Sequence, residues 1–303
     1  MKKPVKDVAA SVRQRLQNVA KKTNRPFQEV LEYFAMERFL YRLASSKHAS
    51  RFVLKGALMF RVWNAPASRP TRDIDLLGRM DSKVTAVVPV FKDMCNQPVE
   101  PDGLIFHADS VAGQAIKEDA DYAGVRITFH ATLQNSRIAM QIDVGFGDVQ
   151  TPAAVATEYP TILDLPAPRL NGYSRETVVA EKFEAMVKLG LVNSRMKDFY
   201  DLCLLSQQYD FDGSLLAHAI TRTFAHRKTQ ILAAPTALTP VFADDAQKQT
   251  QWRAFLRKTR LTNAPAALPD VIVVLVSFLL PIATAIVKGQ AFNQTWKAPG
   301  PWT

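Results

Sequence analysis

Residues 71–78 read Thr-Arg-Asp-Ile-Asp-Leu-Leu-Gly, an apolar stretch interrupted by two aspartates. Successive side chains of a β-strand point to opposite faces, so Asp73 and Asp75 share one face. Ile74 and Leu76 share the other face and predict burial in a core. Two carboxylates this close raise each other's pKa, and a divalent cation such as Mg²⁺, which prefers oxygen ligands, relieves the repulsion. Taken alone, the pair is also compatible with two solvated aspartates at a strand edge.

A third carboxylate follows in a second alternating stretch. Residues 138–144 read Ile-Ala-Met-Gln-Ile-Asp-Val, which places Asp143 on the face opposite Ile142 and Val144. If this strand lies beside the 73–76 strand, three carboxylates converge and form the ligand set of a two-metal phosphoryl-transfer site. The alternative for Asp143 is an exposed hairpin residue, and nearby Asp148 is a competing choice for the third ligand.

A glycine turn precedes the aspartate strand. Residues 52–54 predict a short strand, Lys55-Gly56 a turn, and residues 57–63 a helical segment. Backbone N–H groups at the start of a helix bind phosphate groups. A single glycine is a weak indication, and its position before the aspartate strand adds to its weight.

The remaining pattern predicts a mixed α/β (α+β) chain. Residues 124–133 and 137–145 alternate and predict a hairpin joined by residues 134–136. A proline-dotted connection, 152–168, separates a mixed-sheet lobe with two leading helices (1–165) from an all-helical lobe (166–303). The other expected helices are 5–22, 27–44, 82–95, 109–118, 174–190, 194–208, 213–228, 244–260 and 267–287.

Composition excludes several classes of protein. With 303 residues, 48% hydrophobic and 22% charged, the chain matches a globular protein and not a fibrous or disordered one. Two cysteines, Cys95 and Cys203, cannot build a disulfide framework, which favours a reducing, cytoplasmic location. The basic start has no apolar run behind it, as a secretory signal would. The longest apolar run, 271–283, is shorter than the roughly 20 residues of a membrane span, so we expect a buried helix and no membrane partner.

The net charge of +10 is unevenly distributed. Residues 1–50 carry +7, residues 51–211 carry −3 and residues 212–260 carry +5. Basic ends around an acidic middle fit a polyanion held by the ends, with a metal-binding carboxylate cluster between them. The alternative is that the lysines and arginines serve solubility alone.

These motifs together resemble a known group of enzymes. Lys55-Gly56-Ala57, Arg72-Asp73-Ile74-Asp75-Leu76 and Asp143 resemble the polymerase β-like nucleotidyltransferase superfamily. Residues 180–186 (Ala-Glu-Lys-Phe-Glu-Ala-Met) and 194–202 (Ser-Arg-Met-Lys-Asp-Phe-Tyr-Asp-Leu) are similar to the AbiEii/AbiGii toxins of abortive-infection and type IV toxin–antitoxin systems. The resemblance covers roughly residues 25–230.

Two features depart from the family pattern. Ala57 stands where the family often has a second glycine or a serine, so a hydroxyl contact to phosphate is absent. Fifteen residues separate Ala57 from Asp73, more than in many members. Neither departure removes a metal ligand, but both affect how a nucleotide is positioned.

The resemblance implies a nucleotidyltransferase-like fold, a Mg²⁺ cofactor that Mn²⁺ can replace, and a set of site residues. Lys182 is expected to pair with a triphosphate, and Asp198 to orient either Lys182 or a hydroxyl in the cleft. The implied metal ligands are Asp73, Asp75 and Asp143, which are also catalytic together with Lys182 and Asp198. The implied nucleotide-binding residues are Lys55, Gly56, Ala57, Arg72 and Lys182.

The resemblance also implies a reaction and partners. The expected reaction transfers a nucleoside monophosphate from an NTP to an acceptor hydroxyl of RNA, specifically the 3′ end of tRNA. A toxin of this kind has a separate antitoxin protein encoded nearby. The alternatives are a protein or small-molecule acceptor and, outside the enzymes, a non-catalytic basic RNA-binding protein. The three carboxylates favour an enzyme over the last alternative.

Overall fold

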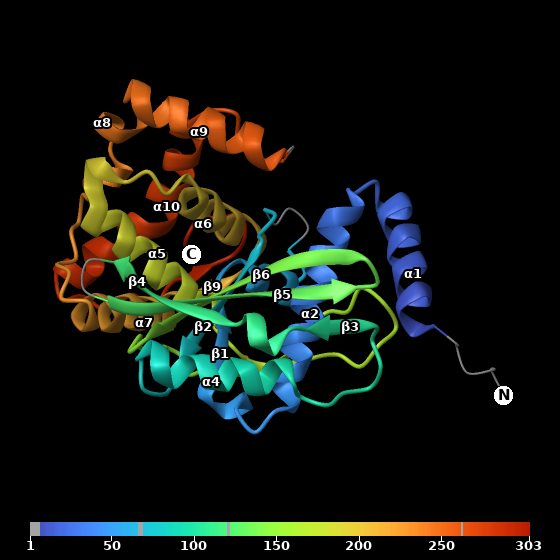
Figure 1. Ribbon diagram of the computed structural model, residues 1–303. Coiled ribbons are helices and arrows are strands. Elements are labelled where there is room, and N and C mark those ends of the chain that lie inside the picture. The colour runs from blue at the N-terminus through green and yellow to red at the C-terminus, as the bar shows by residue number, and fades with distance from the viewer. Residues whose placement is uncertain (1–6, 66–68, 120–121, 262) are drawn as a thin grey trace. The chain divides into compact units, whose positions relative to one another are not determined.

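The computed structural model describes residues 7–65, 69–119, 122–261 and 263–303. The chain forms two compact units, each built from several stretches of sequence (Figure 1). The first unit comprises residues 1–64, 71–147 and 155–172. The second comprises residues 65–70, 148–154 and 173–303. The chain therefore passes between the units more than once.

An eight-stranded mixed sheet forms the centre of the first unit. Its order is β3-β5-β6-β2-β1-β8-β7, and β4 also pairs with β5. Strand β2 runs parallel to β6 and β1 parallel to β8, while the other pairs are antiparallel. The strands are β1 (Phe52–Lys55), β2 (Asp73–Gly78), β3 (Leu104–Phe106), β4 (Ala112–Asp119), β5 (Tyr122–Leu133), β6 (Ser136–Phe146), β7 (Val155–Glu158) and β8 (Arg169–Gly172). The sheet and the helices that follow it confirm the predicted mixed α/β class.

Helices α1 (Val8–Thr23), α2 (Phe27–Ser45), α3 (Met59–Val62) and α4 (Val84–Cys95) complete the first unit. An aromatic cluster joins α2 and α4 to the sheet. The ring centroid of Phe39 in α2 lies 6.0 Å from that of Phe91 in α4. It also lies 5.6 Å from Phe106 in β3 and 5.2 Å from Phe129 in β5. All four rings are buried, and burying each one stabilises the fold by about 1.5–3 kcal/mol.

The long hairpin that carries Asp143 forms, but its turn holds residues 134–135 and not the predicted 134–136, because Ser136 already pairs with Leu133 as the first residue of β6. Strands β5 and β6 pair antiparallel from Leu133↔Ser136 through to Gly124↔Gly145 (Figure 1). Ile127 and Ile142, paired across the hairpin, are fully buried, as alternation requires for the core face. The opposite face of the same two strands carries the polar residues.

The predicted helix over residues 109–118 is wrong. Residues 112–119 form strand β4, which pairs with β5 in antiparallel register from Ala112↔Thr128 onward. Gly113 lets this strand pack closely against α4, because a Cβ there would lie 2.6 Å from a methyl carbon of Val88 and 2.8 Å from one of Val84. Alanine, glutamine, lysine and glutamate in this stretch favour a helix locally, and pairing with β5 overrides that preference.

The sequence pattern also missed several short strands. Strand β7 lies inside the stretch expected as a connection, and β3 and β8 are only three and four residues long. Runs this short carry too few alternations to be distinguished from loops.

The second unit is helical from residue 173 onward, as predicted. Its first helix follows Ser174, the first residue of the expected helix 174–190: the Ser174 hydroxyl accepts a hydrogen bond from the backbone N–H of Thr177 at 3.1 Å. A two-stranded ribbon, β9 (Phe211–Asp212) with β10 (Thr295–Trp296), was not predicted. The helices are α5 (Arg175–Leu189), α6 (Met196–Gln208), α7 (Gly213–His226), α8 (Pro240–Ala243), α9 (Ala246–Thr259) and α10 (Leu268–Val287).

Helix α10 is long and apolar enough to cross a membrane by length and composition. In this structure one side of it packs inside the second unit. Phe278 is fully buried and stacks on Trp302, with ring centroids 5.9 Å apart, and its backbone carbonyl accepts a hydrogen bond from the Trp302 indole N–H. We therefore interpret α10 as a core helix of the helical unit.

Candidate active site

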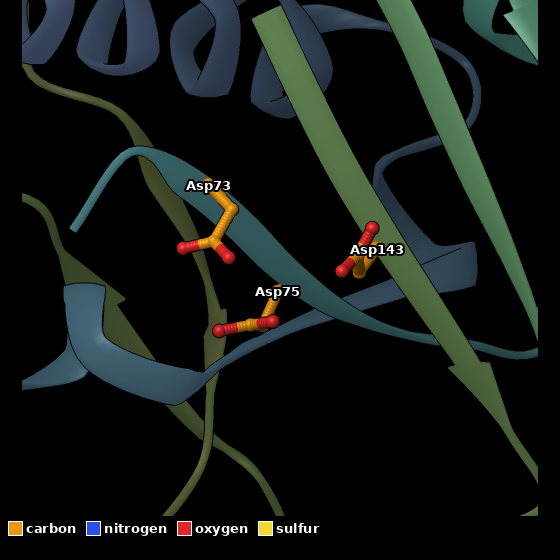
Figure 2. A group of neighbouring side chains, drawn as sticks. All are labelled: Asp73, Asp75 and Asp143. Atoms are coloured by element: carbon orange, nitrogen blue, oxygen red, sulfur yellow. The ribbon is translucent and has the colours of Figure 1, made fainter. Parts of the chain in front are cut away.

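Strands β2 and β6 bring the three predicted carboxylates together. Asp75 and Asp143 are directly paired across these parallel strands. Ile74 and Leu76 are fully buried, so the aspartates of β2 project from the opposite face, as their spacing predicts. One carboxylate oxygen from each of Asp73, Asp75 and Asp143 lies within 4.8 Å of the other two (Figure 2).

This donor set fits a divalent metal ion. Three half-buried carboxylates within this distance repel one another when they are ionised, and a bound cation relieves that repulsion. Hard oxygen ligands from two or three carboxylates suit Mg²⁺ or Mn²⁺, which complete their coordination with water and substrate phosphates. Asp73, Asp75 and Asp143 would hold such an ion.

An arginine that the sequence analysis did not select holds Asp143 in place. Arg126 lies directly opposite Asp143 in the hairpin register. Its Nε donates to Oδ1 at 2.8 Å and its Nη2 donates to Oδ2 at 2.7 Å. The pKa of Arg126 is raised, mainly by this hydrogen bond and further by the charges of Asp143, Asp73 and Asp75. The predicted 134–136 turn would instead pair Arg126 with Val144, so this contact depends on the two-residue turn 134–135, across which Leu133 pairs with Ser136.

Asp73 has a different partner. The Thr71 hydroxyl donates a hydrogen bond to Asp73 Oδ1. The backbone N–H of Thr71 in turn donates to the Tyr33 hydroxyl of α2 at 3.0 Å. This chain of contacts links the Asp73 carboxylate to helix α2, and hydrogen bonds to a ligating side chain fix its orientation toward a metal. Sequence spacing does not predict the contact with Tyr33, because α2 and β2 are distant in the chain.

The glycine turn lies against the same cluster. Gly56 has φ +70°, and a Cβ built on it would lie 1.9 Å from Asp75 Oδ2. Only glycine adopts this backbone conformation without strain while allowing the carboxylate to approach so closely. Its neighbours Lys55 and Ala57 are buried, and Lys55 pairs with Asp75 in the β1–β2 register.

Arg72, predicted to bind nucleotide, has an exposed side chain. Its Nε lies 3.8 Å from Glu32 Oε2, and 89% of the side chain is accessible to solvent. An exposed pair at this distance contributes little to stability.

Lys182 and Asp198 form a second charged cluster, within the second unit. Lys182 Nζ lies 2.5 Å from Asp198 Oδ1 and 2.9 Å from Asp201 Oδ2. Burial lowers the pKa of Lys182, but the two carboxylates outweigh burial, so the pKa is raised and the ammonium stays charged. Asp198 therefore contacts Lys182, and its role in orienting Lys182 at a substrate stays a prediction.

Asp201 and Arg69 complete this second cluster. Arg69 Nε donates to Asp201 Oδ1 at 3.1 Å and Nη2 donates to Oδ2 at 3.2 Å. Burial raises the pKa of Asp201, but Arg69 and Lys182 lower it further than burial raises it. The sequence places Asp201 on the same helical face as Asp198, because the two residues are three positions apart. Its pairing with Arg69, 132 residues away, has no sequence signal.

Asp148, the competing choice for the third ligand, has another role. It belongs to the second unit and accepts a hydrogen bond from Arg227 Nη2 at 2.9 Å. Arg227 also donates to the buried Glu184 at 3.0 Å. This buried network accounts for Asp148, so Asp143 is the residue of the pair that joins the β2 aspartates.

The sequence model of the family described as "Nucleotidyl transferase AbiEii toxin, Type IV TA system" matches residues 38–273. No curated protein matches the chain. Two crystal structures from Helicobacter pylori, JHP933 and a presumed nucleotidyltransferase, each share 15% sequence identity with this chain at a TM-score of 0.48. The matches cover 86% of this chain and 93% and 96% of the Helicobacter chains respectively.

Proposed function

The chain belongs to the AbiEii family of nucleotidyl transferase toxins of type IV toxin–antitoxin systems, and we propose that it transfers a nucleoside monophosphate from an NTP to an acceptor hydroxyl of RNA. The observation that carries this proposal is the convergence of Asp73, Asp75 and Asp143 on one sheet face. A divalent metal bound there would favour deprotonation of the attacking hydroxyl and neutralise charge on the leaving pyrophosphate.

The protein's own residues hold the substrates in this scheme. The three carboxylates supply the oxygen ligands, with Asp143 oriented by Arg126 and Asp73 by Thr71. Lys182 binds the triphosphate as a point charge, and Asp198 keeps its ammonium in position. The turn at Lys55, Gly56 and Ala57 supplies backbone N–H groups for phosphate.

Support for an RNA acceptor comes from the distribution of charge. Helix α1 carries Arg13, Arg15, Lys21 and Lys22, and its last two lysines are exposed. With the surplus of positive charge in residues 212–260, this supports a polyanion, and within the family we propose the 3′ end of tRNA. A separate antitoxin protein and a cytoplasmic location complete the proposal.

The test is incubation of the protein with Mg²⁺, each labelled NTP in turn and total bacterial RNA. Labelled RNA, with tRNA as the main product, supports the proposal. Label in added protein or in a small molecule would identify a different acceptor. Binding of RNA with no transfer of label from any NTP would instead favour a non-catalytic RNA-binding protein.

Asp75→Ala and chelation by EDTA are the matched controls. The variant should lose transfer and keep its fold, because removing a carboxylate also removes repulsion within the cluster. Added Mg²⁺ or Mn²⁺ should restore the activity of the EDTA-treated wild type. Full activity in the Asp75→Ala variant would contradict the site assignment.

A further inference from the structure

Arg126 lies at one end of a charged row that crosses the sheet. The register places Lys55, Asp75, Asp143 and Arg126 side by side on strands β1, β2, β6 and β5. Paired residues of neighbouring strands lie on one face, so two carboxylates in the middle of the row are flanked by a cation on each side. Beyond Arg126 the next register neighbour is Gln114 of β4, an uncharged residue.

The guanidinium uses one of its two forked edges on Asp143. Its planar group has five N–H donors, arranged as an Nε/Nη2 edge and an Nη1/Nη2 edge. The contacts at 2.8 and 2.7 Å occupy the Nε/Nη2 edge. In the part of the chain that the structure describes, Nη1 has no hydrogen bond or ion pair, and 40% of the side chain is exposed.

We propose that Arg126 is a substrate-binding residue that grips the phosphate chain of the NTP with its Nη1/Nη2 edge while its other edge holds Asp143. A guanidinium fork matches two oxygens of a phosphate group as well as it matches a carboxylate. Because Asp143 fixes the plane of the guanidinium, little conformational entropy is lost when phosphate binds. This inference rests on the proposed nucleotidyl transfer and assigns to it a residue outside the three carboxylates and Lys182.

The charge balance of the site supports a role toward an anion. The charges of Asp73 and Asp75 as well as of Asp143 stabilise the Arg126 cation, so it shares the local field of the metal ligands. A metal-bound triphosphate brings negative charge to those ligands. An exposed cation with an open fork beside them therefore has a second anion to bind.

The test separates metal binding from nucleotide binding in the absence of turnover. Mn²⁺ affinity is measured alone by titration calorimetry. Affinity for α,β-methylene NTP analogues is then measured at saturating Mn²⁺, using the base that wild type binds best. The variants are Arg126→Gln and Arg126→Lys. Arg137→Gln is the matched control, because Arg137 is an exposed arginine of the same sheet, on β6. Circular dichroism melts check that each variant folds.

We expect Arg126→Gln to weaken analogue binding by about 10- to 100-fold, the loss typical of charge-assisted hydrogen bonds. Arg126→Lys should recover only part of this loss, since an ammonium cannot bridge two anions through two forked edges. Mn²⁺ affinity should change at least several-fold less than analogue affinity. Arg137→Gln should change neither.

Three results would overturn the inference. Equal weakening of Mn²⁺ and of the analogue would make Arg126 only a positioning residue for Asp143. Tighter binding of both Mn²⁺ and the analogue by Arg126→Gln would mean that the Arg126–Asp143 ion pair competes with the metal for Asp143. Unchanged binding would make it a surface ion pair. If wild type binds no analogue at all, the proposed function itself fails, which is distinct from failure confined to the Arg126 variants.

Discussion

Replacing Gly56 with alanine tests the geometry of the site at its tightest contact. The added Cβ would lie 1.9 Å from Asp75 Oδ2, and real Cβ contacts are not shorter than 3.0 Å. The added Cβ would also lie 2.6 Å from Cγ and 2.7 Å from Cβ of Asp75, so rotating the carboxylate alone does not relieve the clash. The Asp75 side chain must therefore move by about 1 Å. A misplacement of about 1 Å at a reacting centre costs roughly 100-fold in rate.

Backbone strain adds a second, separable cost. At φ +70° an alanine loses about 1–2 kcal/mol relative to glycine. Gly289→Ala isolates this strain, because Gly289 has φ +66° and a Cβ there meets nothing within 4 Å. Gly289→Ala should lose about 1–2 kcal/mol in the free energy of unfolding from strain alone, and Gly56→Ala should lose at least as much, because its clash with Asp75 adds to the strain. Only Gly56→Ala should lose metal affinity and activity.

The assay combines denaturant unfolding, Mn²⁺ titration and labelled-NTP transfer for the two variants and wild type. We expect Gly56→Ala to retain the fold, to bind Mn²⁺ more weakly than Gly289→Ala, and to transfer label about 100-fold more slowly. If Gly56→Ala matched Gly289→Ala in both Mn²⁺ affinity and transfer rate, the close approach of the turn to Asp75 would have no functional role.

Three further predictions concern other parts of the chain. Lys182→Ala should reduce transfer by orders of magnitude and weaken NTP binding. Lys182→Arg should recover little, because a planar guanidinium does not replace an ammonium that two carboxylates hold at 2.5 and 2.9 Å. Unchanged kinetics in Lys182→Ala would mean that Lys182 has only a structural role. Charge reversal at Arg13, Arg15, Lys21 and Lys22 should make the slope of log RNA affinity against log salt concentration shallower by about 0.7 for each lost phosphate contact. The KM for NTP should stay unchanged. An unchanged slope would mean that RNA binds elsewhere on the protein. Burial raises the pKa of Glu37 to about 7, so the folded state binds this proton more tightly than the unfolded state, and the resulting stability is full below pH 4.5 and is lost as the pH rises towards 7. The free energy of unfolding of wild type, measured in urea, should therefore fall by up to about 3 kcal/mol between pH 4.5 and 8, and Glu37→Gln should abolish that part of the pH dependence. An equal pH dependence in wild type and Glu37→Gln would contradict the assignment.

Much of the candidate site follows from local rules that act within one stretch of chain. The common face of Asp73 and Asp75, the outward face of Asp143, and the helix start at Ser174 depend on residue periodicity and capping within a few positions. The β5–β6 hairpin is local in the same sense, because its strands are joined by a short turn. The contact between Lys182 and Asp198 was expected from the family resemblance of the two motifs and not from their spacing.

Other features depend on pairings between distant residues. The parallel contact of β2 with β6 joins Asp75 to a residue far along the chain, and only that contact turns three separate carboxylates into one cluster. The pairing of Arg69 with Asp201 and the hydrogen bond from Thr71 to Tyr33 have no sequence signal either. Residues 112–119 favour a helix locally and form a strand because β5 offers a partner.

The physical reason for this division is the range of the interactions. Which face of a strand or helix a residue occupies is fixed by backbone geometry over a few residues, and that information is present in the order of the amino acids. Which strands become neighbours depends on burying apolar surface across the whole unit, where many pairings satisfy the same local pattern. The sequence by itself therefore determined the candidate ligands and their faces, and the tertiary structure alone decided that they meet and that Arg126, Thr71 and Gly56 lie against them.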